Sequence, residues 1–273
     1  MIIKNIGINF LTNNPANGLF VFCFEPMKTC FNFIILLLLT CVFTPSSAQF
    51  KVDLEGGIIP GTNYNRVRIP SSGGTQINLS DDLNSKTKAF YRIRLGYTFA
   101  KRHNLLLLYA PLTLKYNGRF DRNIDFNGQN FAASSPVDVY YKFNSYRFTY
   151  RYNFIEQGRW QVGAGLTAKI RDADIRFKNE IIDTHYDNVG FVPIINFYAR
   201  YKPNYHWSFL VEGDALAAKQ GRAEDIFAGT SYQINSSLGV KLGYRVLEGG
   251  ADNDKIYNFN WVNYISAGIL LSL

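Results

Sequence analysis

Residues 146–171, YRFTYRYNFIEQGRWQVGAGLTAKIR, decide the fold of this chain. Large apolar side chains alternate here with polar or positively charged ones, and a polar break at 156–159 interrupts the pattern. Successive side chains of a β-strand point to opposite faces. The stretch therefore predicts two strands joined by a tight turn. Each strand has one aromatic and aliphatic face and one face that carries arginine or lysine.

The same two-residue period recurs along residues 50–273, and no segment shows the 3.6-residue period of a helix. The chain is therefore predicted to be all-β. Turn-forming residues, mainly Gly, Asn, Asp and Ser, separate the strands. The breaks alternate between short ones, at 100–103, 156–159, 202–206 and 235–237, and long ones, at 59–87, 119–138, 178–188, 218–224 and 248–256. Counting the break at 235–237 gives about ten strands, with eight or twelve as open alternatives.

The N-terminal residues have the three parts of a secretory signal peptide. Lys28 precedes an apolar run at 31–43, and small residues follow at Ser46 and Ala48. We expect residues 1–26 to be an upstream extension, 27–48 a signal peptide cleaved after Ala48, and 49–273 the exported domain. Lipidation at Cys41 is a disfavoured alternative, because no small residue directly precedes it.

Composition narrows the class of protein further. The net charge is +8, but the basic residues are spread along the alternating strands, so no nucleic-acid partner is expected. Since every cysteine precedes residue 49, neither disulfides nor thiolate metal sites are expected in the exported domain. Beyond the signal peptide no apolar run reaches the length of a membrane helix, whereas barrel strands need only about 9–11 alternating residues.

The chain ends in NFNWVNYISAGILLSL (258–273), with apolar residues at alternate positions up to Leu273. With this ending and its alternation of short and long connections, the exported domain resembles a small outer-membrane β-barrel protein of Gram-negative bacteria. An aromatic residue usually stands where this chain has Leu273. The resemblance implies an antiparallel up-and-down transmembrane barrel with short periplasmic turns and longer extracellular loops. It also implies a monomer in the outer membrane, surrounded by lipid and lipopolysaccharide, whose C-terminal strand meets the barrel-assembly machinery.

Lipid around such a barrel would contact the aromatic face, and the charged face would line the lumen. A soluble lipocalin-like barrel would have to hold all the aromatic side chains inside, which would overfill it. Ten basic and four acidic residues are expected to face inward, the acids including Asp53 and Glu55. The predicted lumen-facing charge network comprises Arg92, Arg94, Arg147, Arg151, Lys169, Arg171, Arg200, Glu212, Asp214, Lys241 and Arg245.

This lumen leaves two interpretations open. The charges form an ion-paired structural core, because buried charges need partners. Alternatively, they line a narrow basic pore that passes or binds small anions, since arginine suits carboxylate and phosphate groups. We expect a structural or narrow-pore barrel.

Two other functions stay open as alternatives. A barrel hydrolase acting on lipid A or peptides would use His185 with Asp81 and Asp82, which are weak catalytic candidates. A surface receptor or adhesin would present the 59–87 loop with Arg66 and Arg68. No cofactor or metal is expected, because the sequence has no phosphate-loop, dinucleotide or complete metal-ligand motif.

Overall fold

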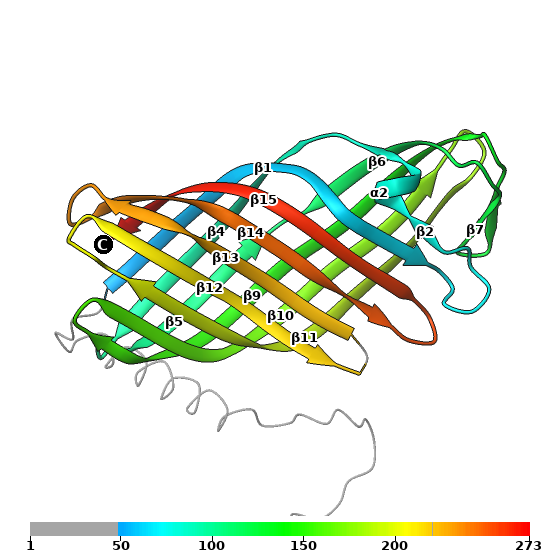
Figure 1. The fold of residues 1–273 in the computed structure, drawn as a ribbon. Helices are drawn as coiled ribbons and strands as arrows, with labels where there is room; N and C mark the ends of the chain where they lie inside the picture. The colour runs from blue at the N-terminus through cyan, green and yellow to red at the C-terminus, as the bar shows by residue number, and fades with distance from the viewer. Residues whose placement is uncertain (1–48, 220) are drawn as a thin grey trace, which may run out of the picture. The chain divides into compact units, whose positions relative to one another are not determined.

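The computed structural model describes residues 49–219 and 221–273; the predicted signal peptide, the upstream extension and all cysteines lie outside this part. It is a closed antiparallel barrel of ten strands (Figure 1), which confirms the predicted fold class. The strands are β1 (Gln49–Arg68), β4 (Lys88–Phe99), β5 (His103–Ala110) continued by β6 (Thr113–Arg119), β9 (Pro136–Gln157), β10 (Trp160–Lys178), β11 (Asp183–Tyr201), β12 (Trp207–Ala218), β13 (Gly221–Gln233), β14 (Leu238–Asp252) and β15 (Tyr257–Ser272). Each strand pairs with the next, and β15 pairs with β1 to close the barrel. No helix in the described part of the chain is long and apolar enough to cross a bilayer.

Strands β5 and β6 form one strand of the barrel, interrupted at Pro111. Both pair with β9, and the register continues from Ala110 opposite Ser145 to Thr113 opposite Lys142. Proline has no backbone N–H, so it interrupts a ladder. The next residue, Leu112, donates its backbone N–H to the Asn144 side chain instead, which keeps the two halves aligned.

The two ends of the barrel differ in their connections (Figure 1). At one end, here called the short-turn end, residues 100–102, 158–159, 202–206 and 234–237 join the strands, as predicted. At the other, the long-loop end, residues 69–87 contain β2 (Ile77–Asn78), α2 (Leu79–Asp82) and β3 (Asn84–Ser85), and residues 120–135 contain β7 (Ile124–Phe126) and β8 (Gln129–Phe131).

Several strands run further toward the long-loop end than the sequence pattern predicted. Strand β1 continues to Arg68, where a loop was expected from residue 59, because it stays paired with β15 up to Tyr257. Strands β12 and β13 are joined across positions 219–220, where a loop was expected over 218–224. Pairing therefore persists where the apolar and polar alternation has already faded.

The outer surface of the barrel is apolar, as predicted for a transmembrane barrel. Along β9 the burial alternates residue by residue, and Phe148 and Tyr150 are exposed while Arg147 and Thr149 are buried. On the neighbouring strand Leu166 is 70% exposed. Large contiguous apolar surfaces are rare on water-soluble monomers but are required where a barrel contacts lipid.

Aromatic side chains lie at both edges of this apolar surface. At the short-turn end the rings of Trp160 and Tyr201 are 4.8 Å apart, and toward the long-loop end Tyr109 stacks on Tyr146 at 5.2 Å. Such girdles form where one side of a ring meets hydrocarbon and the other meets water. They mark the membrane boundaries on the barrel wall.

The interior of the long-loop half is an apolar core, which the sequence pattern did not predict. The β7–β8 hairpin folds inward, and Phe126 stacks on Phe177 with ring centroids 4.0 Å apart. Further buried members of this core come from β1, β2, α2 and β9, and include Val67, Ile77, Leu79 and Val139. This core fills part of the lumen at the long-loop end.

Candidate functional site

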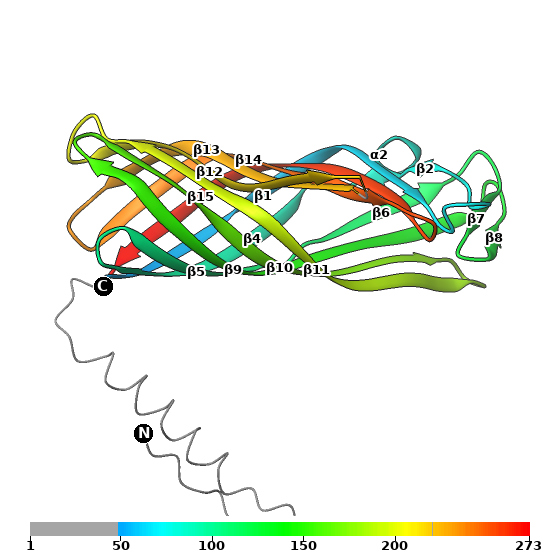
Figure 2. The ribbon, with the colours of Figure 1, turned by 90° about the horizontal axis from the view of Figure 1, so that it is seen from below.

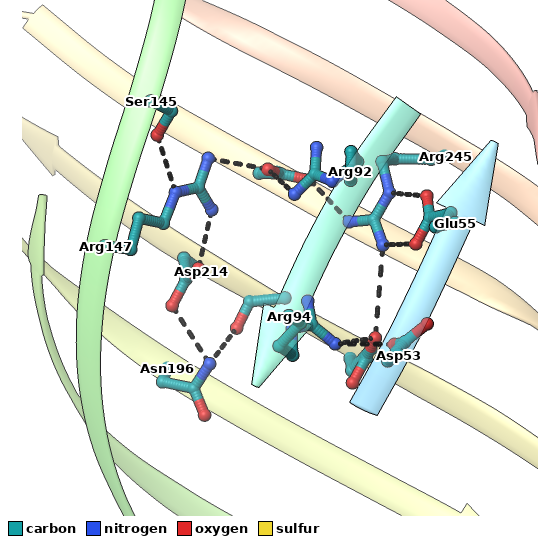
Figure 3. A network of polar contacts seen from close by, with 12 residues as sticks. Asp53, Glu55, Arg92, Arg94, Ser145, Arg147, Asn196, Asp214 and Arg245 are labelled. Atoms are coloured by element: carbon teal, nitrogen blue, oxygen red, sulfur yellow. Dashed lines mark hydrogen bonds and ion pairs between the residues drawn. The ribbon is translucent and has the colours of Figure 1, made fainter. Parts of the chain in front are cut away.

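Ten ionised side chains cross the middle of the lumen and form one connected network. Figure 3 labels seven of them. They come from β1, β4, β9, β12, β13 and β14, so the network ties together strands from all around the barrel. Five are acidic and five are basic: Asp53, Glu55, Glu212, Asp214 and Asp225 face Arg92, Arg94, Arg147, Lys241 and Arg245. The formal charges cancel, and we call this set the charge layer.

Arg245 lies at the centre of the charge layer and is 1% exposed. Its Nε and Nη2 atoms donate to the two carboxylate oxygens of Glu55 at 2.7 and 2.8 Å, and Nη1 donates to Asp225 at 2.6 Å. Such two-pronged contacts between guanidinium and carboxylate are strong and fix orientation. Lys241 also donates to Glu55, and it donates to Asp53, both at 2.8 Å.

Asp225 joins three guanidinium groups. It accepts hydrogen bonds from Arg92 at 2.8 Å and from Arg147 and Arg245 at 2.6 Å. Arg147 also donates to Asp214 at 2.6 Å, and Asp214 accepts a further bond from Asn196 (Figure 3). Because buried charges are costly without partners, this mutual pairing is what allows the layer to exist inside the barrel.

The charge layer leaves almost no free volume. The two voids found beside Arg92 and beside Arg94 in the described residues measure about 10 Å³ each. A single water molecule needs about this much space. The layer therefore separates two larger cavities that share no lining residue, one at each end of the barrel.

The cavity at the short-turn end has a volume of about 750 Å³ and is basic. Outside the charge layer, its ionisable lining consists of one acid, Glu156, and five bases: Lys51, Lys101, Arg151, Arg200 and Lys202. We call this space the basic vestibule. Glu156 is itself hydrogen-bonded to Asn153 and Gln161, so no ion pair within the described residues neutralises the five bases.

Arg151 is the most enclosed base of the vestibule, at 8% exposure. Its guanidinium lies 4.0 Å from the ring centroid of Tyr198, and its Nε has no hydrogen-bond partner among the described residues. Neighbouring Arg200 donates from Nε to Gln161 at 2.6 Å. At the turn after β11, burial and then the nearby Arg200 lower the pKa of Lys202 to about 8.

The cavity at the long-loop end has a volume of about 480 Å³ and a mainly apolar lining. Two of the predicted lumen residues, Lys169 and Arg171, lie here and not in the charge layer. Of the eleven residues in the predicted network, seven belong to the charge layer, and Arg151 and Arg200 line the vestibule.

Three members of the charge layer were absent from the predicted network. Asp53 and Glu55 were expected to face inward but were not part of the predicted network. Asp225 was missed because β13 lacks a clean alternation: Phe227 is buried inside the barrel on the same face as Asp225. The signal that could have found it is the tight β12–β13 connection. That connection sets Asp225 opposite the predicted Asp214.

The weak catalytic candidates lie on different elements, His185 on β11 and the two aspartates on α2. His185 is on β11, with Nδ1 3.1 Å from Asp174, and is largely exposed. Asp82, on α2, is 2.9 Å from Arg122, and Asp81 accepts a hydrogen bond from Asn78. No contact recorded for residues 49–219 and 221–273 joins His185 to either aspartate, so the hydrolase alternative is not favoured.

The first ten residues of the predicted receptor loop, 59–68, belong to strand β1. Arg66 and Arg68 lie on β1 opposite Phe259 and Tyr257, and their guanidinium groups lie over the rings of Tyr64 and Tyr257. The following segment is held down by a hydrogen bond from the Ser71 backbone N–H to the Lys255 carbonyl. These residues form a packed surface, which does not favour the adhesin alternative.

The sequence matches no known family model and no curated protein. Its fold is similar to that of solved outer-membrane barrels. The outer membrane protease OmpT from Escherichia coli has a TM-score of 0.49 at 9% identity, covering 82% of this chain and 97% of that one. Ail, the attachment invasion locus protein of Yersinia pestis, has 0.37 at 10% identity, covering 81% and 99%. The outer membrane protein OprG from Pseudomonas aeruginosa has 0.35 at 12% identity, covering 84% and 97%. Likeness at these identities concerns the fold alone.

Proposed function

We propose that this chain is a closed outer-membrane barrel that binds small anions in its basic vestibule, and that it is not an open pore. The observation that carries the proposal is the uncompensated charge there: outside the charge layer, five bases and one acid line a cavity of about 750 Å³. Guanidinium and ammonium groups without carboxylate partners are the usual means of holding phosphate or carboxylate groups.

Arg151 supports this function most directly. An enclosed guanidinium costs free energy when its donors are unpaired, because it has lost water without gaining a protein acceptor. Its Nε lacks such an acceptor, and Tyr198 covers one face of the group. An anion in the vestibule would supply the missing acceptor. The excess of positive charge would also attract anions into this mouth of the barrel.

The charge layer closes the lumen behind the vestibule. Its voids of about 10 Å³ have no room for a hydrated ion, so an anion that enters the vestibule has no open path through the lumen. Of the two roles considered from the sequence, passage and binding of small anions, we therefore propose only binding, at one mouth of the barrel. We also propose that the barrel is surrounded by lipid and lipopolysaccharide and that its C-terminal strand meets the barrel-assembly machinery.

The test is calorimetric titration of the purified protein in non-ionic detergent with inorganic phosphate at pH 7. We expect saturable binding that Arg151→Gln with Arg200→Gln weakens about tenfold or more, since hydrogen bonds to charged groups contribute about 1.5–3 kcal/mol. The control is Lys86→Gln, which removes the positive charge of an exposed lysine in the 69–87 loop. It should leave the phosphate affinity unchanged.

A parallel recording in planar bilayers tests the closed lumen. Conductance at the level of the noise agrees with the proposal. Absence of phosphate binding to the unaltered protein, or equal loss in the Lys86 variant, contradicts anion binding in the vestibule. A steady open-channel current contradicts the closed barrel.

A further inference from the structure

The barrel wall is open between β11 and β12 toward the long-loop end. Their ladder runs from Tyr201 opposite Phe209 to Ile195 opposite Ala215, and stops there. Beyond this point β11 continues to Asp183 while paired with β10 alone, and β12 turns into β13 (Figures 1 and 2). Residues 183–194 therefore have no strand partner on their β12 side within the described chain. Near the tip of β11, the Asn127 side chain donates to the His185 carbonyl. Pro193, two residues past the last pair, has no N–H to donate.

The cavity of about 480 Å³ at the long-loop end reaches the outside through this opening. Its lining includes Val192 and Leu216, whose side chains belong to the inner face of the wall. Val192 is two residues beyond the buried Ile194, and Leu216 is two residues beyond the buried Asp214. The lining also includes Phe191, which is on the outer face and 68% exposed. One cavity can touch both faces of a wall only where the wall is interrupted.

The outer end of the opening lies against the apolar surface of the barrel. Phe191 pairs across the ladder with Ile170, and Ile170 pairs with Tyr146 on the next strand; all three side chains are exposed. Tyr146 belongs to the aromatic girdle on the long-loop side. A molecule dissolved in the membrane can therefore reach the cavity near the boundary between hydrocarbon and water.

The inner end of the cavity holds a buried lysine. Lys169 is 2% exposed, pairs across the ladder with Arg147 of the charge layer, and lies 4.9 Å from the ring centroid of Phe143. No hydrogen bond or ion pair recorded for the described residues involves its ammonium group. Two residues along the same face, Arg171 bonds to Asn188, and its Nε has no partner.

We propose that this cavity binds a single-chain alkyl carboxylate, taken up from the membrane through the opening between β11 and β12. The carboxylate would contact Lys169 and Arg171, and the chain would lie along Phe143, Leu216 and Phe191. Apolar walls with a few convergent polar groups characterise small-molecule sites of about 300–1,000 Å³. A cavity of about 480 Å³ fits one chain and excludes lipids with several acyl chains. The site is separate from the basic vestibule, so the two proposals stand or fall independently.

The experiment is titration calorimetry with decanoate on the full protein in lipid nanodiscs. Decyltrimethylammonium, with the same chain and the opposite charge, tests the role of the head group. We expect decanoate to bind at least tenfold more tightly than the cationic amphiphile. Lys169→Met should weaken decanoate binding about tenfold. Leu216→Trp, which fills the cavity without changing its charge, should abolish it.

The matched control is Ala164→Trp, an added indole on the exposed lipid face of β10, which should leave decanoate binding unchanged. Each variant is first checked for folding by its heat-dependent mobility in detergent gels, and a variant that does not fold is replaced by Lys169→Gln or Leu216→Phe. The proposal is overturned by absence of decanoate binding, by equal binding of both amphiphiles, or by equal effects of Leu216→Trp and Ala164→Trp.

Discussion

Asp214 and Asp225 lie directly opposite each other on β12 and β13, with both carboxylates inside the barrel. Like charges in this relation destabilise a sheet. Here Arg147 of β9 reaches across the lumen and contacts both carboxylates at 2.6 Å. The two facing carboxylates therefore bind β9 through Arg147, and the charge layer links strands of the wall across the lumen.

Arg147 is therefore expected to matter more for stability than any exposed ion pair. Arg147→Gln should lower the free energy of unfolding by about 3–5 kcal/mol, because it leaves two facing buried carboxylates without their shared partner. The measurement is urea unfolding of the barrel in lipid vesicles, followed by tryptophan fluorescence. Arg176→Gln removes the exposed pair with Asp183 and should cost at most about 1 kcal/mol. Equal losses in both variants would contradict a structural charge layer.

Removing the centre of the charge layer is expected to open the lumen. The double variant Arg245→Ala with Glu55→Ala keeps the layer electrically balanced while deleting one of its buried ion pairs. Planar-bilayer recordings should then show a current that is absent in the unaltered protein, with preference for anions because the basic vestibule is retained. The control pair Arg222→Ala with Glu248→Ala lies outside the layer and should give no current. A silent Arg245 and Glu55 double variant that is correctly folded would argue against these residues as the barrier.

Anion affinity of the vestibule is expected to fall as the pH rises from 7 to 9. The pKa of Lys202 is lowered to about 8, so its ammonium loses the proton, and the vestibule loses one positive charge, as the pH passes through that value. Sulfate is the suitable probe, since its own charge is constant over this range. Lys202→Arg should remove the inflection, because arginine stays protonated. The same pH profile in both proteins would show that Lys202 does not contribute.

The lipid-facing surface can be tested with one substitution. Leu166→Arg places a charge in the middle of the apolar surface and should lower stability in vesicles by about 2–4 kcal/mol, as for charges at the bilayer midplane. Ile181→Arg should have little effect, because Ile181 is 92% exposed in the β10–β11 turn. Folding assays in lipid vesicles measure both. An equal response would mean that residue 166 does not face hydrocarbon.

The barrel was predictable from sequence because the two-residue period is a local property. Each strand shows its own alternation, as in the exposed Phe148 beside the buried Arg147, and lipid requires such strands to close. The short turns were placed correctly for the same reason, since polar residues at 156–159 interrupt two strong patterns.

The rest depends on pairing between strands, which no single strand reveals. Asp225 enters the charge layer because the tight β12–β13 connection sets its register, and a loop predicted over 218–224 concealed that register. The long-loop cavity depends on where the β11–β12 ladder stops. Pro193 lies just beyond that point, but a proline in the sequence does not by itself show where the pairing ends. The apolar core of that end depends on a hairpin folding inward, so its residues resembled ordinary loop sequence.

The stacking of Phe126 on Phe177 has a consequence for recognition at the long-loop end. An antibody that binds this end contacts a packed surface built from β1, α2, β7 and β8. Epitopes there are therefore conformational: their elements lie far apart in the sequence, and a short peptide copied from either long connection would not reproduce them.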